Sequence, residues 1–143
     1  RPKIMIVICC VDERNGMSFE GRRNAQDRRM RDDVRTLFPC LSMDAYAYGL
    51  YGKDDVKCDY EICEDLRDSH YPCILETTPP SAYEDEIEKI VLYQWHNRYP
   101  ATVTMDIDLH DEKWECVDHY CFEGSSHEKI TRAIFQKKVV DVE

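Results

Sequence analysis

The chain begins with a continuous apolar run, KIMIVICCV (3–11), which ends abruptly at DERNG (12–16). A half-buried strand or an amphipathic helix would interrupt such a run with polar residues at regular spacing. An unbroken run that stops at turn residues is typical of a strand covered on both faces, as in a parallel sheet. The run therefore predicts a central strand of an α/β fold.

A helix is predicted to follow, with Asn24 as its N-cap and Pro39 as its end. Before it, Asn15-Gly16 and Glu20-Gly21 mark two turns. The apolar residues of this helix fall at helical spacing and form one buried stripe. The stripe consists of Met30, Val34, Leu37 and Phe38, and Asp27 lies three residues before its first member.

The remaining segments read mostly as strands. A short strand and a helical turn are expected within 40–52, an acidic amphipathic helix at 54–70, and a strand at 73–78. Ser81 and Glu84 have the spacing of a capping box, which predicts another short helix. Strands follow at 89–96, at 102–109 with period two, and at 114–122 and 129–138 as an antiparallel hairpin.

This order predicts a single domain over residues 1–143, of α/β class. Its sheet is mixed and mostly parallel, flanked by helices, with an antiparallel hairpin at the C-terminal end. The length of 143 residues suits one compact core. No apolar run reaches the roughly 18 residues of a membrane span, and no export signal is recognisable. We therefore expect a cytoplasmic protein.

Charge is distributed unevenly along the chain. The stretch GRRNAQDRRMR (21–31) carries five arginines and one acid, in a chain of net charge −10. An acidic body repels bulk nucleic acid and acidic membranes. The charge pattern instead favours a small anion held at the local basic patch, or a protein partner, and a homodimer remains open.

The eight cysteines suggest disulfides, but without an export signal we expect reduced, mostly buried thiols. Zinc is the alternative. Cys58 and Cys63 are five residues apart, as are Cys116 and Cys121. Neither interval matches the shorter spacing of common zinc sites, so we expect no metal.

Several of these segments resemble dihydrofolate reductase. IVICCVDERNGM (6–17) is similar to the first strand and following loop of that family, with Asp12, Gly16 and Met17 at its loop positions. The helix after the loop looks like the family's substrate helix, and 89–124 resembles its late strands. The chain also looks like small bacterial proteins with CVD…GM near the start and FEGSSHEKIT near the end. Some of those carry a ribonuclease Z label, which the histidine spacing of this chain does not support.

Departures from the reductase pattern concern its cofactor. The family has a Gly-Gly turn after the strand corresponding to CIL (73–75), where backbone amides approach a pyrophosphate. This chain has ETTPPSAY (76–83) there. Proline lacks an amide hydrogen, and Glu76 adds a negative charge beside any phosphate. We therefore expect no cofactor, with NADPH implied only if reduction persists.

Two sets of residues are candidate ligand contacts. Arg22 and Arg23 precede the helix without close acidic partners in sequence, and two guanidiniums at a helix start suit a phosphate or carboxylate. The other set is the loop EGSSHEKIT (123–131). Its Ser125, Ser126 and His127 offer hydroxyls and an imidazole to an anion or ring, although Gly and Ser also suit a simple turn.

Asp27 has two interpretations. In the reductase family an acid on this helix bonds the substrate's ring, so the resemblance implies the same contact here, and catalysis only if the chain is a reductase. The structural alternative is an acid at position N3, stabilised by the helix dipole and by Arg31.

The later arginines are expected on the sides of the helix. Arg28–Asp32 and Arg29–Asp33 have the spacing of i,i+4 ion pairs. Aromatic residues are a further set that could line a planar pocket or simply form core. They are Tyr46, Tyr48, Tyr51 and Trp95.

The sequence thus favours a non-catalytic protein that binds an anionic, nucleotide-like ligand on a degenerate reductase-like scaffold. One alternative is an acidic protein-binding inhibitor encoded by a phage or mobile element, of anti-defence or anti-CRISPR type, with its acidic stretches mimicking nucleic acid. The other alternative is a residual NADPH-dependent pterin or folate reductase.

Overall fold

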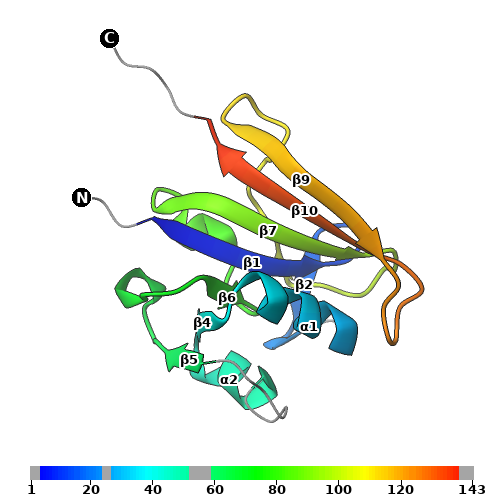
Figure 1. Cartoon of the computed structure of the whole chain (residues 1–143), viewed down its shortest axis with the longest axis horizontal. Helices are drawn as coiled ribbons and strands as arrows, with labels where there is room; N and C mark the ends of the chain where they lie inside the picture. Colours follow the sequence, from blue (N-terminus) through cyan, green and yellow to red (C-terminus); the bar gives the residue numbers. More distant parts are fainter. Residues whose placement is uncertain (1–3, 24–26, 52–58, 139–143) are drawn as a thin grey trace.

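The computed structural model describes residues 4–23, 27–51 and 59–138. Their strands form a seven-stranded sheet of order β5-β4-β6-β1-β7-β10-β9 (Figure 1) and a small sheet of order β3-β2-β8. The large sheet contains β5 (Asp59–Ile62), β4 (Cys40–Met43), β6 (Cys73–Leu75), β1 (Met5–Val11), β7 (Ile87–Trp95), β10 (Ile130–Lys137) and β9 (Trp114–Phe122). The small sheet contains β3 (Arg22–Arg23), β2 (Gly16–Phe19) and β8 (Val103–Thr104). The helical elements are α1 (Arg28–Leu37), α2 (Ala45–Tyr51) and two 3₁₀ turns, η1 (Leu66–Asp68) and η2 (Pro80–Tyr83).

The central strand is β1, as the apolar run predicts. It pairs in parallel with β6 and β7, with Ile8 opposite both Ile74 and Val91. β10 pairs antiparallel with β7 and β9, so the C-terminal hairpin is also confirmed. The structure therefore has the predicted α/β class, with a mixed, mostly parallel sheet and an antiparallel edge.

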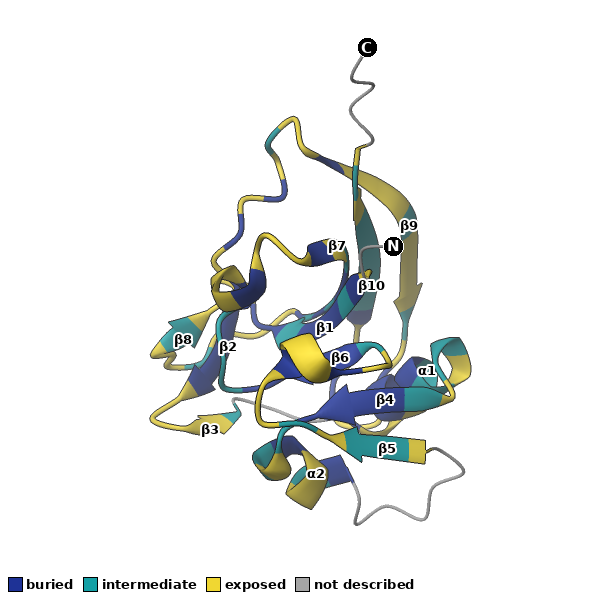
Figure 2. Cartoon of the chain, turned by 90° about the vertical axis from the view of Figure 1, so that its left-hand side faces the viewer, coloured by how far each residue is buried: buried dark blue, intermediate teal, exposed yellow. Residues whose placement is uncertain are grey.

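Each face of the sheet carries its own apolar core, because side chains alternate along a strand. From β1, Val7 and Cys9 point into one core, which β2 and the 105–109 segment cover. Ile8 points into the other core, beneath α1 and α2. Figure 2 shows the small sheet and α1 on opposite sides of the buried central strands. A fully buried Val or Ile side chain contributes about 1.5–3 kcal/mol, so the two cores stabilise most of the sheet.

The helix predicted at 54–70 is wrong within the described part of that range. Residues 59–62 form β5, which pairs in parallel with β4 from Cys40↔Asp59 to Met43↔Ile62. Residues 66–68 form only the single turn η1, and 54–58 lie outside the described residues. Pairing with an open strand edge, which sequence periodicity does not reveal, overrides the local helical pattern.

Two shorter elements also differ from prediction. The capping box at Ser81 does not form, because Pro79 is the N-cap of η2 and Ser81 Oγ and N donate to Asp106 at 2.5 and 3.0 Å. The strand expected over 102–109 is reduced to β8. Met105 and Ile107 are nevertheless buried and Asp106 is exposed, so the alternation reflects packing of an extended segment. No helix in the described ranges is long and apolar enough to cross a membrane.

Candidate functional site

The site is centred on Asp27, at the start of α1. The helix begins at Arg28, so the predicted N-cap at Asn24 is wrong as the start of α1, and Asn24 itself lies outside the described residues. Asp27 is the N-cap rather than N3. Its Oδ1 accepts from the backbone amides of Arg29 at 3.0 Å and Met30 at 3.2 Å. An aspartate satisfies these first-turn donors well, and its charge suits the positive end of the helix dipole.

The loop between β9 and β10 donates to the same carboxylate. Ser125 N lies 3.1 Å from Oδ1, and Ser126 N lies 2.9 Å from Oδ2. Ser126 Oγ and His127 Nδ1 lie 3.2 and 3.1 Å from Oδ2. The structure thus brings together four predicted site residues that are about a hundred positions apart in sequence.

These hydrogen bonds control the charge of Asp27. Its side chain is fully buried, and burial by itself would raise the pKa of the carboxyl. The hydrogen bonds from Ser126, Ser125 and His127 outweigh burial and hold the pKa of Asp27 well below its ordinary value. Asp27 is therefore a stable buried anion.

Gly124 allows the loop to approach this closely. A Cβ added there would lie 2.5 Å from Asp27 Oδ2 and 2.7 Å from the carbonyl oxygen of His127. The Gly124 amide donates to that carbonyl oxygen at 2.9 Å and so closes the turn. The glycine is required here for close approach, not only for turn flexibility.

Behind the loop, His127 is fixed by aromatic residues. Its ring stacks on Trp95 with centroids 4.7 Å apart and planes 17° apart. Its Nε2 lies 3.5 Å from the hydroxyl of Tyr99. Trp95 is fully buried in the core on the helix face, as is Tyr51.

The other two tyrosines of the aromatic set do not join them. Tyr48 is exposed, and the hydroxyl of Tyr46 accepts from the amide of Arg23 at 3.0 Å. Part of the set is therefore core, and the four aromatic residues do not form one wall.

A cavity of about 280 Å³ opens beside Asp27. Its lining is Asp27, Arg28, Arg31, Ser125 and Ser126. Arg28 is exposed, whereas Arg31 is only 7 % exposed. Two guanidiniums and two hydroxyl-bearing residues around one opening are chemically suited to an oxyanion. The negative charge of Asp27 is already bound by its own donors.

Arg22 and Arg23, the predicted anion contacts, lie elsewhere. They form β3, where Arg22 is exposed and Arg23 is partly buried, and neither lines this cavity. The prediction that Arg31 lies on the side of α1 is wrong, because the helix buries it. Its spacing of four residues from Asp27, on the same face of the helix, was the available signal.

The predicted i,i+4 pairs along α1 are also replaced. Asp32 pairs with Arg35 at 3.4 Å. Asp33 pairs with Arg132 of β10 at 2.8 Å and accepts from the hydroxyl of Tyr93 at 2.6 Å. The ion pair and the hydrogen bond of Asp33 therefore hold α1 against the sheet, in addition to the packing of its apolar stripe.

A buried carboxyl that sequence reasoning treated only as a repulsive charge lies on the helix face. Glu76 follows β6 and is 5 % exposed. Burial raises the pKa of Glu76 to about 7, while the positive charges of Arg23 and Arg31 act in the opposite direction. A carboxyl with such a pKa at the carboxyl end of a central strand marks a functional candidate.

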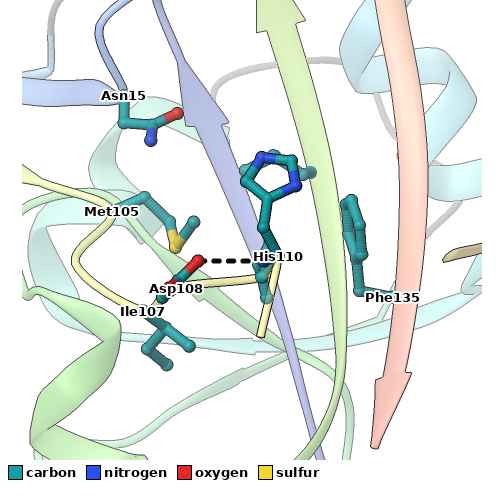
Figure 3. Close-up of a pocket in the computed structure, with 8 residues that line it drawn as sticks. Asn15, Met105, Ile107, Asp108, His110 and Phe135 are labelled. Atoms are coloured by element: carbon teal, nitrogen blue, oxygen red, sulfur yellow. Dashed lines mark hydrogen bonds between the residues drawn. The ribbon is translucent and has the colours of Figure 1, made fainter. Parts of the chain in front are cut away.

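A second, smaller cavity of about 120 Å³ lies on the opposite face of the sheet (Figure 3). Its walls are Leu92, Met105, Ile107, Leu109 and Phe135, and its polar lining is Asn15, Asp108 and His110. Asp108 Oδ1 accepts from the His110 amide at 2.9 Å. No arginine lines this cavity, and five of its eight lining residues are apolar.

Comparison with known proteins identifies the fold. No family model matches the sequence, and no curated protein matches it. The fold is that of dihydrofolate reductase. The chain is similar to the dihydrofolate reductase from Enterococcus faecalis complexed with NADP(H) and RAB-propyl, with a TM-score of 0.64 over 95 % of this chain and 97 % of that chain. The two sequences are 8 % identical, so the similarity establishes the fold alone.

Proposed function

We propose that this chain is a non-catalytic binding protein for a small anionic, nucleotide-like ligand on a dihydrofolate reductase-like scaffold. One observation carries the proposal: Arg28, Arg31 and the two serines line one cavity at the start of α1. Charge-assisted hydrogen bonds from guanidinium groups are the strongest that side chains offer to phosphate oxygens. The sequence analysis expects Arg22 and Arg23 to contact the phosphate. We propose instead that Arg28 and Arg31 bind it.

Binding is favoured over reduction by the state of Asp27. Its carboxylate accepts from five N–H and O–H groups and contacts the His127 imidazole, and its side chain is fully buried. A carboxylate so occupied has no free acceptor site for a substrate ring. A contact between Asp27 and a ligand ring would require the 123–127 loop to move away.

The cavity volume limits the ligand. About 280 Å³ is slightly less than the 300–1,000 Å³ typical of sites that enclose a drug-sized molecule. A phosphate and part of a sugar fit inside, with the base outside the cavity. We further propose that the protein acts in the cytoplasm, where such anions are abundant and cysteines stay reduced.

The test is calorimetric titration with adenosine 5′-monophosphate and, separately, with sodium sulfate. We expect binding of both, a rise in melting temperature, and about tenfold weaker binding in Arg28→Ala. Arg22→Ala is the matched control, because Arg22 is exposed on β3 and outside the cavity.

Equal losses in the two variants, or a loss only in Arg22→Ala, would contradict this location. If neither probe binds, the acidic inhibitor becomes the better interpretation, since the net charge of −10 suits a basic protein target.

A further inference from the structure

The smaller cavity, on the face of the sheet opposite the helices, takes no part in the proposed function. Its volume is about 120 Å³, and its apolar walls are Leu92, Met105, Ile107, Leu109 and Phe135. An apolar cavity of roughly 150 Å³ stays dry and holds a benzene molecule. The cavity is therefore of a size that suits a single ring.

The walls of this cavity are held in place by the surrounding fold. Met105, Ile107 and Leu109 are 5, 6 and 7 % exposed and belong to the buried core of this face. Asn15, at the rim, has a φ of 63°. Its amide donates to the carbonyl oxygen of Asp12 at 3.1 Å, and its carbonyl oxygen accepts from the amide of Met105 at 2.8 Å. The cavity is thus largely preformed, as ligand sites usually are.

Two wall residues favour an aromatic ring over an aliphatic group. Phe135 of β10 and Met105 lie on different sides of the cavity (Figure 3). Aromatic rings pair favourably with one another in offset or edge-to-face arrangements. A thioether sulfur also makes favourable contacts with an aromatic ring. An aromatic ligand therefore gains contacts from both sides that an aliphatic group of the same volume lacks.

The polar residues at the mouth determine the charge of the ligand. Asp108 is exposed, and its Oδ1 accepts from the His110 amide at 2.9 Å, the dashed line in Figure 3. Its Oδ2 accepts no hydrogen bond from the part of the chain that the structure describes. No lysine or arginine is among the described residues that line the cavity. An ammonium group donates a strong, charge-assisted hydrogen bond to such an oxygen, and the net charge of −10 attracts cations.

We propose that this cavity is a second binding site, which takes a small aromatic ammonium compound. Its single ring lies among the apolar walls, and its ammonium group donates to Asp108 Oδ2. The side-chain oxygen of Asn15 is a second acceptor at the mouth. This inference goes beyond the proposed function, since the ligand has the opposite charge and the cavity lies on the other face of the sheet.

Benzylamine is the probe, because it carries one ring and one ammonium group. ¹⁵N–¹H spectra recorded during its titration at pH 7 should show saturable shifts of the Asn15, Asp108 and His110 amides, with those of Ser125 and Ser126 unchanged. Benzyl alcohol has the same ring without the charge and should bind about tenfold more weakly. Benzoate and methylamine should give no saturable shift, because the first carries the wrong charge and the second has no ring.

Two variants separate the contribution of the charge from that of the ring. Asp108→Asn keeps an oxygen for the His110 amide but removes the charge, so benzylamine should bind about tenfold more weakly and benzyl alcohol as before. Leu92→Phe fills the cavity and should weaken both compounds. Glu112→Gln removes an exposed carboxylate outside the lining and should bind like the unchanged protein. If Leu92→Phe does not fold, the Asp108→Asn and Glu112→Gln pair decides alone.

Four results would overturn this inference. The first is the absence of saturable shifts at the three mouth amides with benzylamine. The second is equal weakening in Asp108→Asn and Glu112→Gln, which would reduce the effect to general attraction of cations. The third is methylamine binding as tightly as benzylamine, which would exclude the ring from the contact. The fourth is equally tight binding of isoamylamine, which would show that the cavity does not select an aromatic ring. None of these results bears on the anion site, whose reporters are Ser125 and Ser126.

Discussion

The two faces of the central sheet differ in the kinds of side chain that they bury. Alternating apolar residues that are close in sequence fill the face opposite the helices, such as Met105, Ile107 and Leu109. The helix face also has a buried apolar core, but it contains in addition Asp27, Arg31 and Glu76, all nearly or fully buried. The small apolar cavity lies on the first face and the arginine-lined cavity on the second. Both faces have a cavity, so it is the buried charge that distinguishes the candidate functional face.

The largest effect should come from removing the centre of the charged face. Asp27→Ala leaves the backbone amides of Arg29, Met30, Ser125 and Ser126 without their acceptor in a buried place. We expect a loss of about 3–4 kcal/mol in the free energy of unfolding, measured in urea at pH 7. Asp108→Ala, at the mouth of the apolar cavity, should cost less than about 1 kcal/mol. Similar losses in the two variants would remove the distinction between the faces.

The lowered pKa of Asp27 also determines how the free energy of unfolding should fall at acid pH. Its folded pKa lies below its unfolded value, so its contribution is complete above the unfolded pKa and is lost as the pH falls towards the folded pKa. The unfolded pKa of an aspartate is about 3.9. The acid-induced loss of stability below about pH 4 should therefore be smaller in Asp27→Asn than in the unchanged protein.

Glu76 should change the free energy of unfolding with pH in the opposite direction to Asp27, and over a different pH range. Its folded pKa of about 7 exceeds the unfolded value of about 4.3, so the buried carboxyl lowers stability progressively as the pH rises between these values. The full difference amounts to about 4 kcal/mol. Glu76→Gln should thus be more stable than the unchanged protein at pH 8 by about 3–4 kcal/mol and similar at pH 4. Urea unfolding at both pH values measures this, and a loss at pH 8 would refute it.

The next largest effect on stability should come from the close approach of the 123–127 loop to α1. In Gly124→Ala, the new methyl group would lie 2.5 Å from Asp27 Oδ2 and 2.8 Å from Ile130 Cδ1, so the 123–127 loop must shift. We expect a loss of about 2 kcal/mol. Gly49→Ala in α2 meets nothing within 4 Å and should gain about 0.5 kcal/mol from helix propensity. A neutral Gly124→Ala in thermal unfolding would show that the loop is not held against Asp27.

The smallest effects should come from the exposed mouths of the two cavities. Arg28→Ala and His110→Ala each remove an exposed side chain, and both should leave stability within about 0.5 kcal/mol. They differ in binding, since only Arg28 lines the charged cavity. Weaker binding of adenosine 5′-monophosphate by His110→Ala than by Arg28→Ala would transfer the proposed site to the apolar face.

The sequence predicts the apolar face of the sheet better than the face that buries charged residues. The run at 3–11 and the alternation at 102–109 depend on side chains close in sequence, so β1 and the buried Met105 and Ile107 can be recognised from pattern alone. β5 could not, because its pairing with β4 joins segments whose contact no local period encodes. For the same reason the sequence does not reveal the ion-pair partner of Asp33 in α1, which is Arg132, about a hundred residues away.

Within the candidate site, residue types were easier to predict than their partners. Asp27 is identified from its place on the helix stripe and from the reductase resemblance, and the serines from their hydroxyl groups, but their mutual contact depends on the docking of the β9–β10 loop. Arg31 is buried because it lies four residues after Asp27 and three before Val34, two buried positions on the same face of α1.

The most direct test of the account is a ¹⁵N–¹H spectrum recorded during titration with adenosine 5′-monophosphate. Binding in the charged cavity should give saturable shifts centred on the amides of Arg28, Ser125 and Ser126, with Arg22 of β3 and His110 of the opposite face unchanged. Saturable shifts centred on Arg22 or His110, or no shift at any of these positions, would contradict it.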